Sequence, residues 1–360
     1  MADSHNDLIS FVASMTGEGN LRVEENFGEG FVRLRISEAE RRQAKHDIQH
    51  VEDIVVEMLR NARDAGASKI YVATAKEDGI RTILFIDNGS GVPENMQERI
   101  FDARVTSKLE SMKMDKWGVH GRGMALFSIK QNVDTAEVVA SGSNLGSSFR
   151  VVIQPDTLSE RADQSSWPKV EKNDEGVFVC VKGPHNIPRT TSEFALEELR
   201  VCDVYLGSPT EIAATLYAHA QNSLDQTQLL FIDDETTLPV YERLGCAADA
   251  SDFIRIASQI GIDVSERTAH RILAGSIEPL RSVSARLLRQ RTSTTPKEVD
   301  LIKDRRGLKI SQDDLKDFSR VLERDFSQLA EKYYVNLNAD PKIRVHKDKI
   351  TVTFEIDKGE

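Results

Sequence analysis

The apolar positions between residues 37 and 66 recur every three or four residues, which is the period of an amphipathic helix. They are Ile48, Val51, Val55, Met58, Leu59 and Ala62. Ser37 is followed three residues later by Glu40, the spacing of a capping box at a helix N-terminus. The pattern predicts a helix, continuous or interrupted, that begins after Ser37 and ends near Gly66.

After residue 66 the pattern changes to short runs that are rich in β-branched and aromatic residues. Residues 69–73 and 81–86 form two such runs, and Asp78-Gly79 between them is a hairpin-type turn signal. Two antiparallel strands are therefore expected to follow the helix. The same region is expected to continue with an apolar helix at 124–131 and strands at 136–140 and 147–153.

Residues 93–122 interrupt this alternation. Their periodicity is poor and their charge is high, and a long segment of this kind in a compact domain is usually functional. We expect a long mobile segment here.

The second half of the chain is mixed and then helical. Residues 154–172 are polar and contain two prolines, which predicts a linker or long loop. Later elements are a strand at 177–181, helices at 190–199, 209–221 and 311–332, helical pattern from 248 to 291, and strands at 343–345 and 350–356. The expected domains are 1–155, 156–247, 248–309 and 310–360.

Composition places the chain among globular proteins. It has 360 residues, 39% hydrophobic and 29% charged, enough for more than one folded core. Its cysteines, Cys180, Cys202 and Cys246, lack metal-ligand spacing, which favours a reducing compartment. The chain has no apolar run of membrane-spanning length and no secretion-type order at its N-terminus, so a cytoplasmic location without membrane contact is expected.

The net charge of −11 is unevenly distributed along the chain. Residues 267–309 carry 11 Lys or Arg and 4 Asp or Glu, a local balance of 11 − 4 = +7. Residues 258–273 have the pattern of two short helices around a glycine turn, as in helix-turn-helix modules. This region is a candidate for binding DNA phosphates, and a solvated basic face or a partner-docking helix is the alternative.

Three polar residues of the first predicted helix are spaced to share one face. Glu57, Asn61 and Asp64 stand at i, i+4 and i+7. An amide oxygen suits Mg²⁺ that also holds phosphate oxygens, and a carboxylate one turn away can polarise a water molecule. Taken alone, this spacing more often marks solvated polar positions on an amphipathic helix.

Two glycine-rich turns follow. Asp87-Asn88-Gly89-Ser90-Gly91 ends a predicted strand, where a carboxylate can accept from an exocyclic amine. Gly118-x-x-Gly121-x-Gly123 leads into a helix whose N-terminus could receive phosphate. Thr106, Ser107 and Lys108 add two hydroxyls and an ammonium group.

Together these segments resemble, over residues 50–153, the GHKL ATPase superfamily of gyrase, ninety-kilodalton heat-shock chaperones, histidine kinases and MutL. The resemblance implies an α+β, Bergerat-type sandwich: a mixed sheet covered on one face by helices, followed by a mixed and helical C-terminal region. It implies ATP and Mg²⁺ as cofactors, with Glu57 as general base and Asn61 as metal ligand. Nucleotide contacts are expected from Asn61, Asp64, Asp87, Gly89, Gly91, Val92, Thr106, Ser107, Lys108, Gly118, Val119, His120, Gly121, Arg122, Gly123, Met124 and Ser148.

The motifs look more like those of MutL and the type IIB topoisomerase B subunit than those of histidine kinases. His46 and His50 lie too close to Glu57 to form a separate phosphoacceptor domain, and no counterpart of the MutL lysine that reaches the γ-phosphate is evident. We expect that ATP binding orders residues 93–122 and creates a homodimer surface, and that hydrolysis resets both. A DNA-transacting or repair ATPase, a clamp acting on protein, and a histidine or serine protein kinase all stay open.

Overall fold

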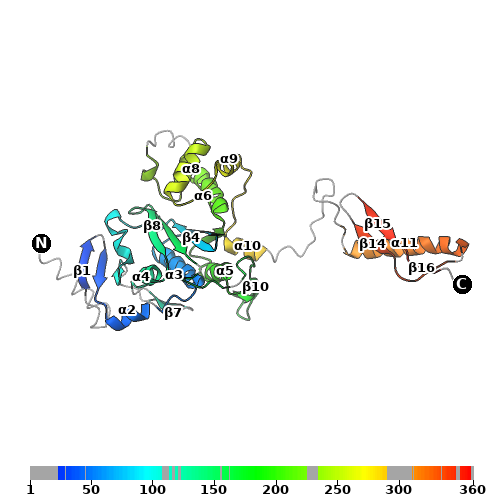
Figure 1. Cartoon of the computed structure of the whole chain (residues 1–360), viewed down its shortest axis with the longest axis horizontal. Helices are drawn as coiled ribbons and strands as arrows, with labels where there is room; N and C mark the ends of the chain where they lie inside the picture. The colour runs from blue at the N-terminus through cyan, green and yellow to red at the C-terminus, as the bar shows by residue number, and fades with distance from the viewer. Residues whose placement is uncertain are drawn as a thin grey trace. The chain divides into compact units, whose positions relative to one another are not determined.

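The computed structural model describes two compact units, residues 1–291 and residues 292–360 (Figure 1). The described residues are 23–28, 30–44, 46–107, 113–115, 118–120, 123–154, 156–161, 163–224, 234–289, 310, 312–333, 335–345 and 349–357. For residues 113–115 and 118–120 the description covers the backbone only.

A five-stranded mixed sheet organises the first unit. Its order is β12 (Asp203–Gly207), β3 (Lys69–Glu77), β4 (Ile80–Asp87), β9 (Ser147–Ile153) and β8 (Thr135–Ser141). β12 runs parallel to β3, and the other neighbours are antiparallel. The sheet and its helices confirm the predicted α+β class.

The predicted hairpin is the centre of this sheet. β3 and β4 pair from Ile70 with Asp87 to Glu77 with Ile80. Asp78 and Gly79 form the turn, with φ values of 50° and 85° respectively. Both values lie in the left-handed region that Asp and Gly tolerate in a two-residue turn. This register places Asp87 at the end of β4, beside the start of β9.

Helices cover both faces of the sheet. α3 (Val51–Asp64), α4 (Ala125–Asn132) and α5 (Ile187–Glu197) contribute to one core, into which Ile70, Ile83 and Phe85 project. The alternate residues, such as Tyr71, Leu84 and Ile86, project into a second core. That core is completed by α6 (Pro209–Ser223), α8 (Ala250–Gln259) and α9 (Glu266–Leu273), which Figure 1 shows grouped together. The first layer was predicted, and the second is an addition to the predicted sandwich.

The N-terminal region forms a separate small sheet. β1 (Val23–Gly28) pairs with β2 (Phe31–Leu34), and β2 pairs with β5 (Val105–Thr106). The helix predicted after Ser37 is interrupted: α2 (Glu38–Ala44) precedes α3. The Ser37 backbone N–H and hydroxyl both donate to Glu40 Oε2 at 2.9 Å, so the capping box that opens α2 is confirmed.

The first part of the predicted mobile segment is packed. Two 3₁₀ turns, η1 (Glu94–Met96) and η2 (Arg99–Phe101), bury Met96, Ile100 and Phe101 in the first core. Turns of three residues are too short to leave a periodic pattern in the sequence. Farther on, β6 (Lys113–Asp115) pairs with β7 (Gly118–His120).

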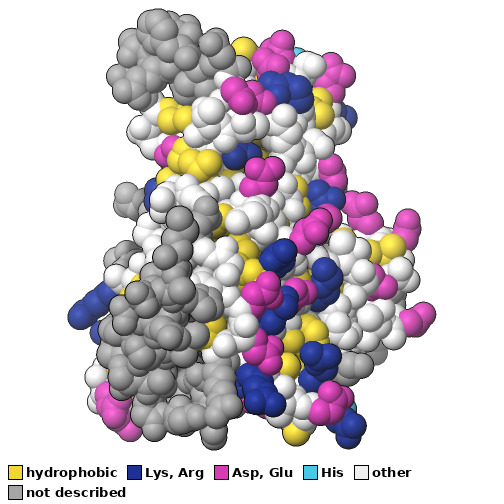
Figure 2. Space-filling view, turned by 90° about the vertical axis from the view of Figure 1, so that its left-hand side faces the viewer, with side chains coloured by type: hydrophobic (Ala, Val, Ile, Leu, Met, Phe, Trp, Pro, Cys, Tyr) yellow, Lys and Arg dark blue, Asp and Glu magenta, His cyan; other side chains and the backbone are white. Residues whose placement is uncertain are grey.

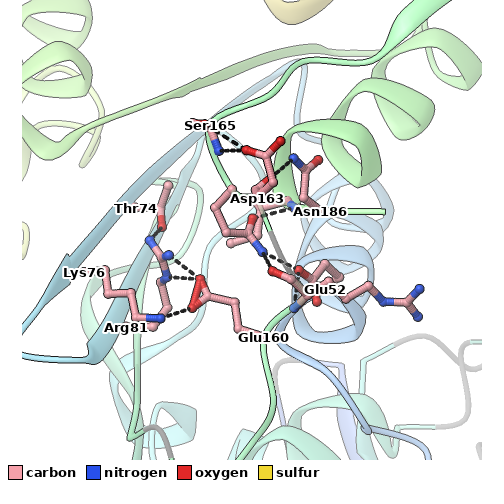
Figure 3. Close-up of polar contacts among 11 residues, drawn as sticks. Glu52, Thr74, Lys76, Arg81, Glu160, Asp163, Ser165 and Asn186 are labelled. Carbon is pink, nitrogen blue, oxygen red and sulfur yellow. Dashed lines mark hydrogen bonds and ion pairs between the residues drawn. The ribbon is translucent and has the colours of Figure 1, made fainter. Parts of the chain in front are cut away.

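Residues 156–161 and 163–166, predicted as part of a linker, are bonded to two strands and two helices of the first unit (Figure 3). Glu160 accepts from Lys76 Nζ at 2.7 Å and from Arg81 Nε at 3.0 Å, both on the central hairpin. Glu52, in the first turn of α3, accepts from Gln164 Nε2 at 2.6 Å. Asn186, which caps α5, donates to the carbonyl of Ser166 at 2.8 Å. These bonds fix the N-terminal end of α3 against the sheet.

Shorter elements complete the first unit. They are the hairpin of β10 (Lys169–Lys172) and β11 (Phe178–Lys182), the turns η3 (Glu235–Thr237) and η4 (Arg243–Cys246), and α10 (Val283–Arg289).

The second unit is small. α11 (Gln312–Tyr333) precedes β14 (Lys342–Val345), which pairs with β15 (Ile350–Thr353), and β13 (Asn336–Leu337) pairs with β16 (Ile356–Asp357). Phe326 of α11 stacks on Phe354 with ring centroids 4.5 Å apart. None of the helices within the described ranges is long and apolar enough to cross a membrane.

Candidate functional site

A cavity of about 690 Å³ lies at one end of the central sheet in the first unit. Its walls come from α2 and α3, the end of β4, residues 104–107, the start of α4 and the start of β9. This size is within the usual range for small-molecule and cofactor sites. The cavity gathers segments that are far apart in the sequence.

The polar face of α3 forms one wall. Glu57, Asn61 and Asp64 all line the cavity, as their spacing on one helix face predicts. Glu57 Oε1 accepts from Arg60 Nη1 at 2.6 Å. Asp64 Oδ1 accepts from Arg63 Nε at 3.0 Å, and Arg63 Nη1 reaches Glu198 Oε1 at 2.6 Å. The helix thus presents a carboxylate, a carboxamide and a second carboxylate in line.

Asp87 is the buried carboxylate of the site and is only 3% exposed. Its Oδ1 accepts from the backbone N–H of Gly89 at 2.8 Å, and its Oδ2 accepts from the Ser147 hydroxyl at 2.8 Å. These bonds fix the orientation of the carboxylate at the edge of the cavity.

Two glycines allow the turn after β4 to pack closely. Gly91 has φ of +69°, and a Cβ there would lie 2.0 Å from the carbonyl oxygen of Gly142. A Cβ on Gly89 would lie 2.9 Å from the carbonyl oxygen of Ala65, at the end of α3. A side chain at Gly91 is therefore excluded by both conformation and space, which explains why this position is a glycine.

The predicted Ser148 requires a correction. Its hydroxyl donates to the carbonyl of Ile260 at 2.7 Å, on the α8 side of the sheet, and it does not line the cavity. The neighbouring Ser147 lines the cavity instead, and its hydroxyl donates to Asp87 Oδ2. Successive side chains of a strand point to opposite faces, so an error of one residue transfers the side chain to the other face of the sheet.

The remaining predicted residues divide into two groups. Val92, Thr106, Ser107, Gly123 and Met124 line the cavity. Lys108, Gly121 and Arg122 lie outside the described residues, and for Gly118, Val119 and His120 the structure describes only the backbone of β7. The arrangement of the predicted phosphate-binding turn therefore stays a prediction.

The cavity also has lining residues that sequence reasoning missed. Phe31, Glu40 and Gln43 come from β2 and α2, and Arg104 precedes β5. Glu40 belongs to the predicted capping box and Arg104 lies two residues before the predicted Thr106, but neither was expected at the site, and Phe31 and Gln43 belong to no predicted motif. Only the Ser37-to-Glu40 capping box marked this region, and it signals a helix start rather than a ligand site.

The charges that line the cavity are predominantly negative. Its described walls carry two guanidinium groups, those of Arg60 and Arg104, and five carboxylates: Glu40, Asp47, Glu57, Asp64 and Asp87. No cluster of three or more His, Cys, Asp or Glu side chains in the described part of the chain could hold a metal by itself. Asn61 and the carboxylates beside it are hard oxygen ligands, which fit Mg²⁺ that is held mainly by a ligand's phosphates and by water.

The outer surface shows no corresponding concentration of charge on the face in Figure 2. The described acidic and basic side chains are interspersed there, with small groups of hydrophobic side chains between them. A second, open hollow lies on α9, where Arg267, His270 and Arg271 are exposed. It lies within the basic region 267–309 that was predicted to bind DNA, of which residues 267–289 are described.

Comparison with known proteins assigns a family to the segment that forms most of the cavity. Residues 46–157 match the family described as histidine kinase-, DNA gyrase B- and HSP90-like ATPase. The DNA mismatch repair protein MutL of Pediococcus pentosaceus is 37% identical over 101 residues, 28% of this chain and 16% of MutL. MutL of Chlorobium phaeobacteroides is 33% identical over 136 residues, 37% of this chain and 22% of that protein. A signal transduction histidine-protein kinase of Streptomyces coelicolor is 25% identical over 133 residues, 37% of this chain and 24% of the kinase.

The matched segment covers less than a quarter of the length of each of these relatives. It includes α3, β3, β4, α4, β8 and β9, which together form most of the cavity. The predicted resemblance is confirmed: residues 46–157 are an ATPase domain of the GHKL superfamily.

Proposed function

We propose that this chain, through its GHKL-type domain, binds ATP with Mg²⁺ in the 690 Å³ cavity and hydrolyses it. One observation carries the proposal. The same cavity is lined by Glu57, Asn61 and Asp64 of α3 and by the buried Asp87 of β4, which lies 23 positions after Asp64 in the sequence. Oxygen ligands suited to Mg²⁺ and a hydrogen-bond acceptor suited to a nucleobase therefore line one cavity.

Each residue has a role that its surroundings support. Asp87, fixed by Gly89 and Ser147, accepts from the exocyclic amine of adenine. The Asn61 amide oxygen would hold Mg²⁺ together with the phosphates, and the ion would neutralise charge that develops on them. Glu57 takes the proton of the attacking water as general base.

Hydrolysis is favoured over transfer of the phosphate to protein because Glu57 lines the cavity. A carboxylate one turn from the metal ligand is suited to activate water. A protein kinase remains the alternative reaction, since one of the relatives is a histidine-protein kinase.

We infer a DNA-transacting or repair context for the ATPase cycle. Two of the relatives are DNA mismatch repair proteins, and α9 exposes Arg267 and Arg271, which are suited to phosphate contacts. In this proposal ATP binding orders residues 93–122 and favours a homodimer, and hydrolysis resets both. A clamp that acts on protein without DNA is the alternative.

The test is phosphate release from ATP, measured with and without duplex DNA and with a parallel assay for labelled phosphate on protein. Wild-type protein is expected to release phosphate only with Mg²⁺, and to do so faster with DNA. Glu57→Gln should retain ATP affinity within about twofold and lower turnover by about 10²- to 10⁴-fold, the usual contribution of a general base.

Glu77→Gln is the matched control, because Glu77 is an exposed carboxylate at the end of β3. It should change neither quantity. Equal loss of binding and turnover in Glu57→Gln would contradict a base role, and label on protein without free phosphate would favour the kinase. Turnover that is indifferent to DNA would favour the protein clamp.

A further inference from the structure

Arg104 combines three features: a buried side chain in the cavity wall, a left-handed backbone conformation and a buried donor without a described partner. Its side chain is 9% exposed and lines the cavity. Its backbone has φ of +63°, the left-handed region that a long side chain rarely adopts. Its Nε is buried without a hydrogen-bond partner among the described residues. A buried guanidinium with an unmet donor is costly, so it requires an explanation.

The strained backbone of Arg104 is held from both sides. Its N–H donates to the carbonyl of Gly123 at 2.9 Å, and its carbonyl accepts from the N–H of Leu34 at 3.0 Å. Strain that the surrounding structure maintains in this way is typical of ligand-contacting positions. The two bonds aim the side chain at the cavity.

Glu40 is the ion-pair partner of the Arg104 guanidinium. Its Oε1 accepts from Arg104 Nη2, and its Oε2 accepts the two capping bonds from Ser37. The Arg104 guanidinium and the cap bonds together lower the pKa of Glu40, with the backbone bond from Ser37 as the largest cause. Glu40 is therefore an anion that is anchored to α2 and placed against the cation inside the cavity.

The charge balance of the cavity shows why this pair matters. Arg60, the other guanidinium on the described walls, is bonded to Glu57 of its own helix. Beside the proposed Mg²⁺, a fixed cation favours a polyphosphate in a cavity lined by five carboxylates, and a guanidinium binds phosphate oxygens well because of its planar donors. Arg104 has an unmet donor, and its present partner is a carboxylate from outside the matched residues 46–157.

We propose that Arg104 is a phosphate-binding residue of the nucleotide site, and that the Glu40 carboxylate holds the place of a phosphate until ATP enters. ATP exchanges its phosphate for Glu40 on the guanidinium, and this exchange releases the N-terminal helix α2 from the cavity wall. The proposal rests on the proposed function, since it assigns a phosphate contact within the same site.

The experiment is equilibrium binding of ATP and of adenosine, which lacks phosphates, to the full chain and to Arg104→Gln, Glu40→Gln and the double variant. Arg104→Gln should weaken ATP by about 10- to 100-fold and leave adenosine within about twofold, because a charged hydrogen bond to phosphate is lost. Arg104→Lys should recover part of the loss. Glu40→Gln retains a capping side chain and should tighten ATP by about threefold or more, since the competing anion is removed.

The double variant separates exchange from general electrostatics. Glu40→Gln should no longer tighten ATP when Arg104 is Gln; an equal gain in both backgrounds would overturn the proposal. Arg33→Gln and Glu38→Gln are the matched controls, because Arg33 pairs with Glu25 and Asp102, Glu38 lies near Arg42, and neither residue lines the cavity.

The outcomes also distinguish this proposal from the proposed function. If wild-type protein binds neither ATP nor adenosine, both fail. If it binds both and Arg104→Gln weakens them equally or not at all, only the assignment of Arg104 fails. If Arg104→Gln does not fold, Glu40→Gln decides: weaker or unchanged ATP binding overturns the proposal.

Discussion

Ser147 and Ser148 are adjacent residues whose hydroxyls serve opposite faces of the sheet. Ser147 donates to Asp87 Oδ2, and Ser148 donates to the Ile260 carbonyl. We expect Ser147→Ala to weaken ATP and adenosine binding by about tenfold, because it leaves the buried Asp87 carboxylate without one of its donors. Ser148→Ala should leave both affinities unchanged and lower the free energy of unfolding by about 1 kcal/mol.

Each serine is the control for the other, and the measurements are equilibrium binding and urea denaturation of both variants. Loss of nucleotide affinity in Ser148→Ala with none in Ser147→Ala would restore the sequence-based assignment and contradict the observed geometry.

The parts of the site that were predictable are those in which spacing fixes direction. Glu57, Asn61 and Asp64 share a helix face in any register, so the sequence alone placed them together. The prediction for Ser148 failed because successive side chains of a strand point to opposite faces of the sheet. The contact between Arg104 and Glu40 could not be predicted, since it depends on pairing between β2 and β5 and on the position of α2.

At the scale of elements, α6 packs on the sheet through a buried aromatic cluster. Tyr71 of β3 and Tyr205 of β12 stack with ring centroids 5.0 Å apart, and Tyr71 Oη lies 2.7 Å from Nδ1 of His219 on α6. Burial, followed by the nearby positive charge of Lys69, lowers the pKa of His219 below its ordinary value of 6.5. The folded protein therefore disfavours the protonated imidazole at this contact.

The consequence is a defined pH dependence of stability. The unfolded chain binds a proton to His219 more readily than the folded protein does, so the free energy of unfolding should decrease as the pH falls below about 6.5. Urea midpoints measured between pH 8 and pH 5.5 check this, and His219→Gln should reduce the slope. An unchanged slope in His219→Gln would assign the pH dependence to other groups.

Elements were predictable where their signals are local. The β3–β4 hairpin, with its Asp78-Gly79 turn, and the helices α3, α6 and α11 matched local patterns. β12 was missed because a five-residue parallel strand gains its identity from pairing with β3, and the paired residues Asp203 and Lys69 are 134 positions apart in the sequence. The second helical layer depends on the same long-range packing.

At the scale of the whole molecule, the described lining of the cavity belongs to the first unit. The described residues that line it lie between Phe31 and Phe149, and the two hydrophobic clusters are built from residues between Phe27 and Leu288. A chain that ends after residue 291 thus retains both cores and the complete described cavity. It should fold cooperatively by itself.

We expect this shortened chain to bind ATP within about twofold of the affinity of the full chain, because it loses no described contact to the cavity. Binding and turnover measured side by side make the comparison informative. Intact binding with lost turnover would indicate that residues after 291 supply a catalytic group, such as the lysine that the MutL resemblance implies. A loss of ATP affinity of tenfold or more, with adenosine binding retained, would instead mean that those residues contact the phosphates in the ground state, and the site would then extend beyond the first unit.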